Sequence, residues 1–288
     1  MRFDGVYGSR TQDIGAIVTT IDTQCIPMDG ATRIVEIKNL YMSLTSNVDK
    51  DRFIKYYSEY VAGSDRTEII IYESNYHENI IDSIYAMFDV YLQPNTQIFF
   101  NNNTFVGVSG LFGGAYIYNS GEINMNDNIY MNSSNFGIGM MNFMSTESVK
   151  IDGMTIDNVV ATGTSFNYGI NFKVNEGSNI TINNFKATNS NMGFQSLIHV
   201  GSMINKFTLT NSKLESISLS SNIALVTLMR VEAISVDTLN WTNLRRNSKE
   251  DLDIFIFSIG SINLNTTTDS SINSVTVVNS TIGFLKLK

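Results

Sequence analysis

The sequence predicts an all-β protein built as a parallel β-solenoid with coils of about 26–30 residues. Three observations predict this fold. From about residue 96 onward, a short run of alternating apolar and polar residues repeatedly ends at an Asn. These runs are four to seven residues long and lack the spacing of a helix. The 288 residues also include 34 Asn, 31 Ser and 25 Thr, which is a turn-rich composition.

The repeat can be followed through seven copies. Each copy is a strand-like run followed by an Asn and then by a second apolar or small cluster, as in EINMNDNIYM and SNITINNFKA. We take one Asn in each copy as its marker: Asn102, Asn128, Asn158, Asn184, Asn211, Asn240 and Asn279. Successive markers lie about 26 to 30 residues apart, except for the last two, which lie about 39 residues apart. This recurrence indicates a period of about 28 residues.

Each interval also holds a second alternating run, ten to fifteen residues after the marker, as in FGIGMMNFM and YGINFKVN. Two or three strands per coil are therefore expected. In such a solenoid each strand pairs with the coils above and below it, and the inward side chains stack in apolar ladders. Asn suits the corners between strands, because it tolerates the left-handed backbone conformation that a sharp corner requires.

Residues 1–95 are less regular, and we expect early coils interrupted by a helical excursion. Within residues 50–63, the apolar residues from Phe53 to Val61 have the spacing of one helical face. Residues 80–90 are compatible with a helix or with two buried strands, and periodicity does not decide between them. Residues 32–44 resemble the later repeat, with Asn39 in the marker position.

Residues 96–288 are expected to form the regular part of the solenoid. Their longest interval contains LRRNSKEDLD at 244–253, the densest charge cluster in the chain. This cluster is most simply a solvated loop at one corner, with a partner-binding loop as the alternative. The sequence closes on GFLKLK, an alternating run without a polar cap, although solenoids need capped ends. We therefore expect these residues to be a segment of a longer chain.

Composition excludes several classes of protein. With 19 basic and 27 acidic residues and a pI of about 4.8, the chain has no basic stripe for binding a nucleic acid. No apolar run approaches the roughly 20 residues needed to span a bilayer. Cys25 is the single cysteine, so no intrachain disulfide is expected. The first nine residues, MRFDGVYGS, lack the apolar stretch of a secretory signal.

Residues 99–121, FFNNNTFVGVSGLFGGAYIYNSG, resemble the repeats of polymorphic outer-membrane proteins. In those repeats an F-x-x-N element is followed by G-G-A and a hydrophobic residue. Phe100, Asn103 and Gly113-Gly114-Ala115 fit this pattern. Similar β-helices occur in pectin-lyase-like proteins and in very long surface proteins of protists, including ciliates. The resemblance implies a right-handed, pectin-lyase-like parallel β-helix, of a kind often found in secreted adhesins or surface fibres.

Parallel β-helices also host polysaccharide lyases and hydrolases, so an enzyme is the main alternative. Hydrolysis of a glycosidic bond uses two carboxylates, one of which has a raised pKa. The sequence lacks the Asp-Asp pair and the Gly-His of the β-helix hydrolases. Its tight acidic cluster, Glu250, Asp251 and Asp253, has basic neighbours that neutralise it. Asp152 and Asp157 are five residues apart, which does not by itself bring them to one site. We predict no catalytic residue.

The two histidines give no metal-binding pattern. His77 and His199 are far apart in the sequence, and neither has a nearby Cys or second His. A zinc site needs three or four such ligands. Calcium would need several carboxylates in a short stretch, and the Gly-rich nonapeptide of calcium-binding β-rolls is missing. We therefore predict no metal and no cofactor.

Six Asn-x-Ser/Thr sequences are candidate N-glycosylation sites. They begin at Asn102, Asn132, Asn179, Asn240, Asn265 and Asn279. Chance predicts about as many in a chain this rich in Asn, Ser and Thr, so their number is no evidence of secretion. Aromatic side chains such as Tyr116, Tyr168 and Trp241 suit stacking on sugars, although core ladders are the commoner use.

A repeated coil without a convergent acid, base or metal set favours a non-catalytic structural or adhesive solenoid. We expect it to be part of a larger cell-surface or extracellular fibre protein. The alternatives are a carbohydrate-active β-helix enzyme, either a lyase or a hydrolase, and a self-assembling filament subunit. The expected partners are other proteins, copies of the chain joined laterally or end to end, and surface glycans.

Overall fold

The computed structural model describes most of the chain beyond residue 95 and a smaller part before it. The described residues are 2–4, 32–43, 46–47, 54–57, 66–77, 80–81, 88–91, 96–110, 112–118, 121–134, 139–161, 168–192, 196–219, 224–246, 255–262, 270–280 and 283–287.

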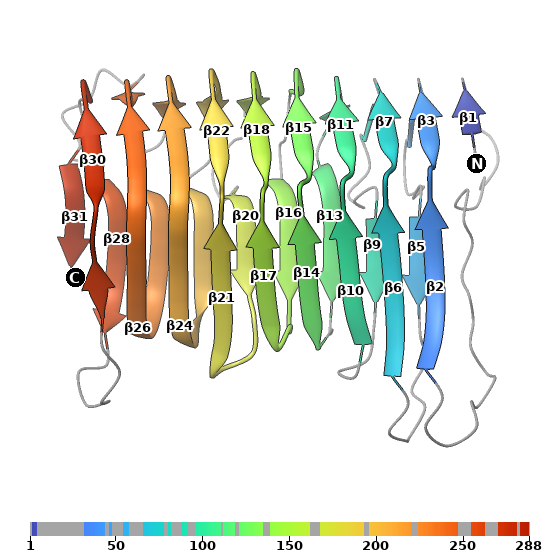
Figure 1. The fold of residues 1–288 in the computed structure, drawn as a ribbon, viewed down its shortest axis with the longest axis horizontal. Coiled ribbons are helices and arrows are strands. Elements are labelled where there is room, and N and C mark those ends of the chain that lie inside the picture. The colour runs from blue at the N-terminus through green and yellow to red at the C-terminus, as the bar shows by residue number, and fades with distance from the viewer. Residues whose placement is uncertain are drawn as a thin grey trace.

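The described elements are all β-strands, and they stack in parallel, coil upon coil, along the long axis of the molecule (Figure 1). Each coil passes in turn through four ladders of strands. The first ladder comprises β2 (Thr32–Lys38), β6 (Arg66–Tyr72), β10 (Thr96–Asn101), β14 (Glu122–Asn126), β17 (Ser148–Asp152), β21 (Ser178–Asn183), β24 (Ser196–Glu215), β26 (Ala224–Thr242) and β29 (Ser271–Ile272).

The second ladder follows the first after a short corner. It comprises β1 (Arg2–Asp4), β3 (Tyr41–Ser43), β7 (Asn75–His77), β11 (Thr104–Val106), β15 (Ile129–Met131), β18 (Thr155–Asp157), β22 (Lys186–Thr188), the ends of β24 and β26, and β30 (Val275–Val278).

The third and fourth ladders complete each coil. The third is made of very short strands: β4 (Ser46–Asn47), β8 (Ile80–Ile81), β12 (Ser109–Gly110), β19 (Val160–Ala161), β23 (Asn191–Met192), β25 (Ser218–Leu219) and β27 (Arg245–Arg246). The fourth comprises β5 (Ile54–Tyr57), β9 (Phe88–Tyr91), β13 (Phe112–Tyr118), β16 (Gly139–Met144), β20 (Tyr168–Lys173), the starts of β24 and β26, β28 (Phe255–Ile262) and β31 (Gly283–Leu287).

Contacts between equivalent residues of neighbouring coils measure the length of each coil. The sequence separation is 25 residues between Asn101 and Asn126, and 36 residues between Asn243 and Asn279. The predicted solenoid is therefore confirmed, but the predicted range of coil lengths is too narrow. Strand register is fixed by pairing with the neighbouring coil, whereas the connections between ladders vary in length.

The helix predicted over residues 50–63 is wrong where the structure describes that range. Residues 54–57 form β5, which pairs in parallel with β9, and the rest of the range lies outside the described residues. Of residues 80–91, Ile80–Ile81 form β8 and Phe88–Tyr91 form β9, as the two-strand alternative predicts, whereas residues 82–87 lie outside the described residues. The early strands β6 and β7 pair directly with β10 and β11, so the sheets continue across residue 95.

Two rows of residues in the left-handed conformation form the corners on either side of the second ladder. The first corner row is Asn39, Glu73, Asn102, Asp127, Gly153, Asn184, Asn211, Thr238 and Ser274. The second corner row is Gly107, Asn132, Asn158, Asn189, Ser216, Asn243 and Asn279. Asn predominates because its short amide side chain makes positive φ less costly than in most residues.

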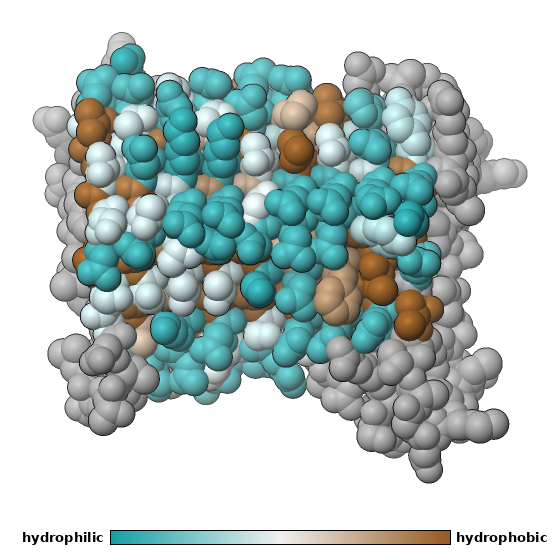
Figure 2. All heavy atoms as spheres, viewed as in Figure 1, coloured by the Kyte–Doolittle hydropathy of each residue, from teal (hydrophilic) through white to brown (hydrophobic). Residues whose placement is uncertain are grey.

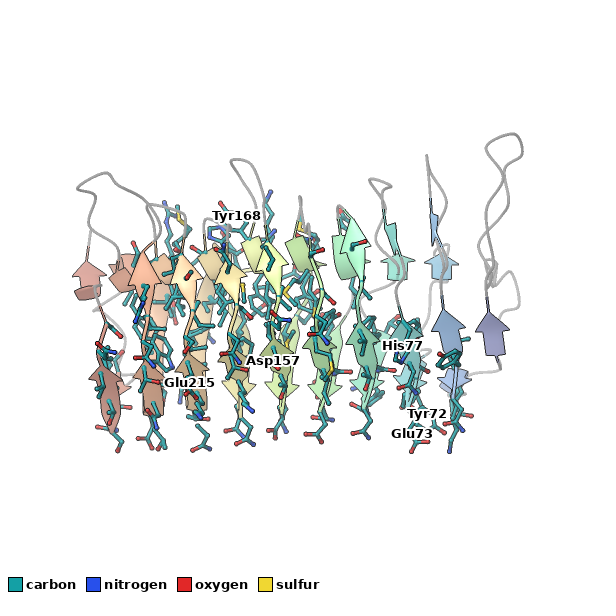
Figure 3. All side chains as sticks on the ribbon, turned by 90° about the horizontal axis from the view of Figure 1, so that it is seen from above. Tyr72, Glu73, His77, Asp157, Tyr168 and Glu215 are labelled. Atoms are coloured by element: carbon teal, nitrogen blue, oxygen red, sulfur yellow. The ribbon has the colours of Figure 1, made fainter. Side chains whose placement is uncertain are left out.

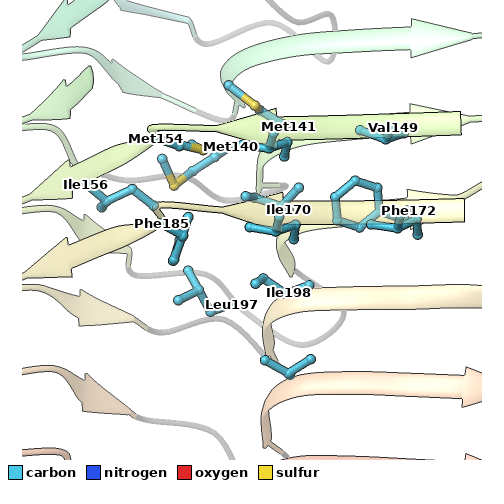
Figure 4. Packing of buried hydrophobic residues seen from close by; sticks show 14 of the residues in the cluster. Met140, Met141, Val149, Met154, Ile156, Ile170, Phe172, Phe185, Leu197 and Ile198 are labelled. Atoms are coloured by element: carbon cyan, nitrogen blue, oxygen red, sulfur yellow. The ribbon is translucent and has the colours of Figure 1, made fainter. Parts of the chain in front are cut away.

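Apolar side chains in register fill the space that the ladders enclose. One row, each member at most 2% exposed, is Ile98, Ile123, Val149, Ile180 and Phe207. Figure 4 shows side chains of the second ladder and its preceding corner facing those of the fourth ladder. The residues labelled there include Met154, Ile156 and Phe185 on one side and Met141, Ile170 and Ile198 on the other. Burial of these rows supplies the main force that holds coil on coil.

A short aromatic stack reinforces this core in the second ladder. The rings of Tyr76, Phe105 and Tyr130 follow one another on three coils, with centroid separations of 4.7 and 4.3 Å. All three side chains are fully buried. Because parallel strands in register place equivalent residues directly above one another, ring stacking follows from the fold itself.

Two further features bear on the sequence predictions. Within the described residues, no helix is long and apolar enough to cross a membrane. Of the charged cluster 244–253, Leu244 is buried and Arg245–Arg246 form β27, whereas residues 247–253 lie outside the described part of the chain.

Candidate functional site

The two aspartates considered as catalytic carboxylates lie at the ends of two strands, each next to a corner. Asp152 Oδ1 accepts hydrogen bonds from the side-chain amides of Asn183 at 3.1 Å and Asn184 at 2.7 Å. Asp157 Oδ1 accepts one from Thr188 Oγ1 at 2.5 Å and one from the Asn189 amide at 3.2 Å. All four donors belong to the next coil, so each carboxylate joins one coil to the next.

The pKa shifts of Asp157 and Glu215 are opposite to the shift that a general acid needs. The hydrogen bond from Thr188 is the main cause that lowers the pKa of Asp157 below its ordinary value. The hydrogen bond from Lys213, followed by the charge of Lys213, lowers the pKa of Glu215. A glycosidase acid needs a raised pKa, because it must stay protonated until it donates to the leaving group. Both carboxyls are therefore ionised at neutral pH.

Other acidic side chains also pair locally. Lys213 Nζ lies 2.7 Å from Glu215, and Lys38 Nζ lies 3.7 Å from Glu73. The described residues contain no group of three or more His, Cys, Asp and Glu side chains that could hold a metal ion. Glu250, Asp251 and Asp253 lie outside the described residues.

A row of polar side chains in the fourth ladder is the most unusual arrangement of functional groups. This row, the polar seam, consists of Asn142, Asn171, His199, Thr227 and Ser258, one residue per coil in register. Asn142, Thr227 and Ser258 are each only 7 or 8% exposed. The Asn171 amide donates to Asn142 Oδ1 at 3.0 Å. Buried polar groups normally make hydrogen bonds, but Asn142 Nδ2 finds no partner among the described residues.

His199 stands at the centre of the polar seam. Its ring stacks on Tyr168 with centroids 3.8 Å apart and an interplanar angle of 6°. Burial lowers the pKa of His199 to about 4 and raises the pKa of Tyr168. His199 Nδ1 is buried and makes no hydrogen bond within the described part of the chain. At neutral pH this side chain is therefore an uncharged imidazole with one unused nitrogen.

Figure 3 places Tyr168 on the opposite side of the solenoid from Tyr72, Glu73 and Glu215. The stacked ring pair and these acidic side chains therefore belong to different faces. His77, the other histidine, lies beside Tyr41 in the second ladder, with ring centroids 5.4 Å apart and ring planes tilted by 31°. The two histidines thus stay apart in space as they do in the sequence.

The seven marker asparagines do not form a single row. Five lie at positive φ: Asn102, Asn184 and Asn211 in the first corner row, and Asn158 and Asn279 in the second. Asn128 follows the corner residue Asp127; it is buried and donates to the Phe100 carbonyl at 2.6 Å. Asn240 is an exposed residue within β26, paired with Thr276.

The candidate glycosylation asparagines are all on the surface where the structure describes them. Those exposed are Asn102, Asn132, Asn179, Asn240 and Asn279, whereas Asn265 lies outside the described residues. Exposure makes each of the five sterically available to a modifying enzyme.

The residues of the repeat motif are split between two ladders. Phe100 and Asn103 are buried beside the first corner row. Gly113, Gly114 and Ala115 lie in β13, where the pairing with β16 shifts register between Phe112 and Ala115. A small-residue run suits such a bulge, because Gly adopts irregular backbone angles at little cost.

The sequence analysis does not predict the polar seam. The repeat period could have revealed part of it, because Asn171 and His199 are separated in the sequence by one predicted period and therefore lie in register on adjacent coils. Comparison with protein-family models, with curated proteins and with solved structures finds no match to this chain.

Proposed function

We propose that this chain is a non-catalytic structural or adhesive β-solenoid, part of a larger cell-surface or extracellular fibre protein. The observation that carries the proposal is the direction of the polar contacts at the corners. Asn158 donates to Asn132 at 2.8 Å, Asn211 to Asn183 at 2.8 Å, and Asn279 to Asn243 at 2.6 Å. Each of these hydrogen bonds runs from coil to coil, so the polar side chains at the corners hold successive coils together along the length of the solenoid.

The front face of the solenoid supports an adhesive role. Figure 2 shows that hydrophilic and neutral residues cover most of the described part of this face. Regularly spaced side chains on parallel strands give a flat, repeating surface, which suits contact with a partner over a long distance.

We also propose kinship with right-handed, pectin-lyase-like β-helices that carry polymorphic outer-membrane-protein-like repeats. The support is the parallel stacking of coils together with the placement of the Phe100–Asn103 element at a corner and of Gly113–Ala115 at a bulge. An extracellular location follows from this kinship and belongs to the same proposal.

The proposal is tested by measuring polysaccharide cleavage and adhesion side by side. The purified chain is incubated with neutral and uronate-containing polysaccharides, and new reducing ends and unsaturated products are quantified. The same chain is coated on beads, and retention on polysaccharide surfaces is measured under flow. We expect retention without product. Sustained product formation that is lost in Asp157→Asn or His199→Gln would overturn the proposal.

The second candidate is a carbohydrate-active enzyme, and the polar seam is the observation that favours it. Buried polar atoms that find no partner in the described residues, next to a stacked Tyr168–His199 pair, occur at functional sites more often than in structural sheets. Cleavage that depends on Tyr168 and His199 would support this candidate. The third candidate is a self-assembling filament subunit. Sedimentation tests it, because polymers that form as the protein concentration rises would indicate self-assembly.

A further inference from the structure

In the second corner row, a serine stands between two asparagines. Ser216 lies between Asn189 and Asn243. At two steps of this row, from Asn132 to Asn158 and from Asn243 to Asn279, the amide of the later coil donates to the side-chain oxygen of the earlier one. The Asn189 amide donates to Asp157 instead. A serine side chain is shorter and offers no carbonyl oxygen at that place.

A hollow of about 370 Å³ beside Ser216 opens to solvent. Its described lining is Ser216, Ser218, Asn243 and Arg245, all polar. Ser216 and Asn243 are stacked corner residues of adjacent coils, and Ser218 pairs in register with Arg245 between β25 and β27. The volume lies within the usual range of small-ligand sites.

The hydrogen-bonding groups in this hollow are mostly unused donors. Asn243 Oδ1 already accepts from Asn279 at 2.6 Å, and the amide NH₂ of Asn243 makes no hydrogen bond with the described residues. The hydroxyls of Ser216 and Ser218 also make none within that part of the chain. An amide NH₂ and two hydroxyls thus face the same space without an acceptor.

Arg245 adds a positive charge to these donors. Its side chain is exposed and makes no ion pair with the described residues. The carboxylate of Glu215, the residue before Ser216, pairs with Lys213 at 2.7 Å rather than with Arg245. A guanidinium with neutral donors around it is complementary to an oxyanion, because two of its N–H groups can bind two oxygens at once.

We propose that Arg245, Asn243, Ser216 and Ser218 form a binding site for an oxyanion group, such as the carboxylate of a sugar acid or a sulfate. The site extends the proposed function by giving an adhesive solenoid a chemical preference for acidic ligands. The biological role of the site rests on the proposed function, but its existence does not, because anion binding is measured independently of adhesion and cleavage.

The test measures binding of glucuronate, glucose 6-sulfate, inorganic sulfate and uncharged methyl glucoside by titration calorimetry at constant ionic strength. We expect the chain to bind the anions and not the neutral sugar. Arg245→Gln is expected to weaken anion binding by about tenfold or more, because a charge-assisted pair is lost. Arg230→Gln, which removes an exposed arginine of β26, is the matched control and should leave binding unchanged.

Ser216→Asn provides the sharper variant. Asn suits the positive φ of 57° at this position and supplies the oxygen that the Asn243 amide lacks. We expect it to fill the hollow and weaken anion binding by about tenfold, with an unchanged or higher midpoint of thermal unfolding. This variant separates loss of the site from loss of the fold.

The outcomes are distinct. Equal binding of inorganic sulfate and the sugar anions would support a site for a free anion, and preference for a sugar anion would support a glycan site. Unchanged binding in Arg245→Gln or Ser216→Asn, or no binding of any anion by the wild-type chain, would overturn the proposal. Anion binding without adhesion to polysaccharide would overturn only the adhesive function.

Discussion

Asn103 is a single side chain that ties three coils together behind the first corner row. Its Nδ2 donates to the Ile71 carbonyl at 3.0 Å and to Asn128 Oδ1 at 3.1 Å, and its Oδ1 accepts from the Ser74 amide at 3.3 Å. The side chain is fully buried. It therefore satisfies backbone groups that the corner leaves without a strand partner.

Replacing Asn103 by Leu is expected to destabilise the fold by roughly 2–4 kcal/mol, because the buried Ser74 N–H and Ile71 C=O each lose a hydrogen bond. The measurement is denaturant unfolding followed by circular dichroism. Asn101→Ser is the control, since it removes only the half-buried bond from Asn126 to Asn101. A loss for Asn103→Leu no larger than for this control would contradict the assigned role.

His199 predicts how stability depends on pH. Its pKa is about 4 in the folded state against an ordinary value of 6.5, so folding favours the neutral imidazole. The stability that this preference contributes is fully present above pH 6.5 and is lost as the pH falls from 6.5 toward 4. The lowered pKa values of Asp157 and Glu215 act at lower pH, where those carboxylates become protonated.

We therefore expect the thermal midpoint of the wild-type chain to fall between pH 6.5 and pH 4, and that of His199→Gln to fall less over this interval. Differential scanning calorimetry at closely spaced pH values measures the difference. His77→Gln keeps His199 in place and should retain the wild-type loss. Parallel curves for wild type and His199→Gln would refute the assignment.

At the scale of the elements, close approach between coils depends on glycine in the fourth ladder, as at Gly169 and Gly260. A Cβ added to Gly169 in β20 would lie 2.6 Å from the backbone oxygen of Leu197 in the next coil. That oxygen belongs to a paired strand, so it cannot withdraw without opening the β20–β24 ladder. A side chain at Gly201, by contrast, would meet mainly the His199 ring, at 3.2 Å.

Gly169→Ala is expected to lower the free energy of unfolding by roughly 2 kcal/mol or more, because it forces backbone apart in a packed ladder. Gly201→Ala, in the next coil, should cost less than half as much, because a side-chain ring can shift by a few tenths of an ångström. Chemical denaturation compares the two variants. Similar losses of unfolding free energy for both variants would show that the close contact between Gly169 and the Leu197 backbone oxygen does not restrict the side chain at position 169.

The same scale explains what sequence could predict. Alternation and Asn recurrence identify strands and corners, because both follow from local backbone geometry. They do not separate the two corner rows, since connections vary in length and Asn128 falls directly after the corner at Asp127. The spacing near residues 50–63 favours a helix, but β5 is defined by pairing with β9 in the following coil, which local periodicity cannot reveal.

The functional groups were less predictable than the strands. The polar seam and the hollow at Arg245 both join residues about one coil apart, and their members are ordinary polar residues when read singly. Ser216 and Asn243 are separated by one coil, as are Ser218 and Arg245. A search at the predicted period would pair them, but only the alignment of the corner row shows that Ser216 occupies a corner position between two asparagines.

At the scale of the whole molecule, the strand pairings of the described residues join each coil only to the coils next to it. The free energy of unfolding of such a solenoid is approximately the sum of a contribution from each coil and a contribution from each interface between neighbouring coils. A substitution that destabilises one coil should therefore act locally. Ile182 is suited to test this, because it is fully buried in β21 and in register with Ile151 below and Leu209 above.

Ile182→Ala removes three buried carbon atoms and is expected to cost about 2–5 kcal/mol within its own and adjacent coils. Hydrogen exchange followed by mass spectrometry should show reduced protection in residues 148–152, 178–183 and 204–210, with wild-type protection in residues 66–77 and 255–262. Ile182→Val should produce the same pattern at a smaller amplitude. An equal loss of protection in all these segments would mean that the coils unfold as one cooperative unit, and that the distant coils depend on contacts beyond their neighbours.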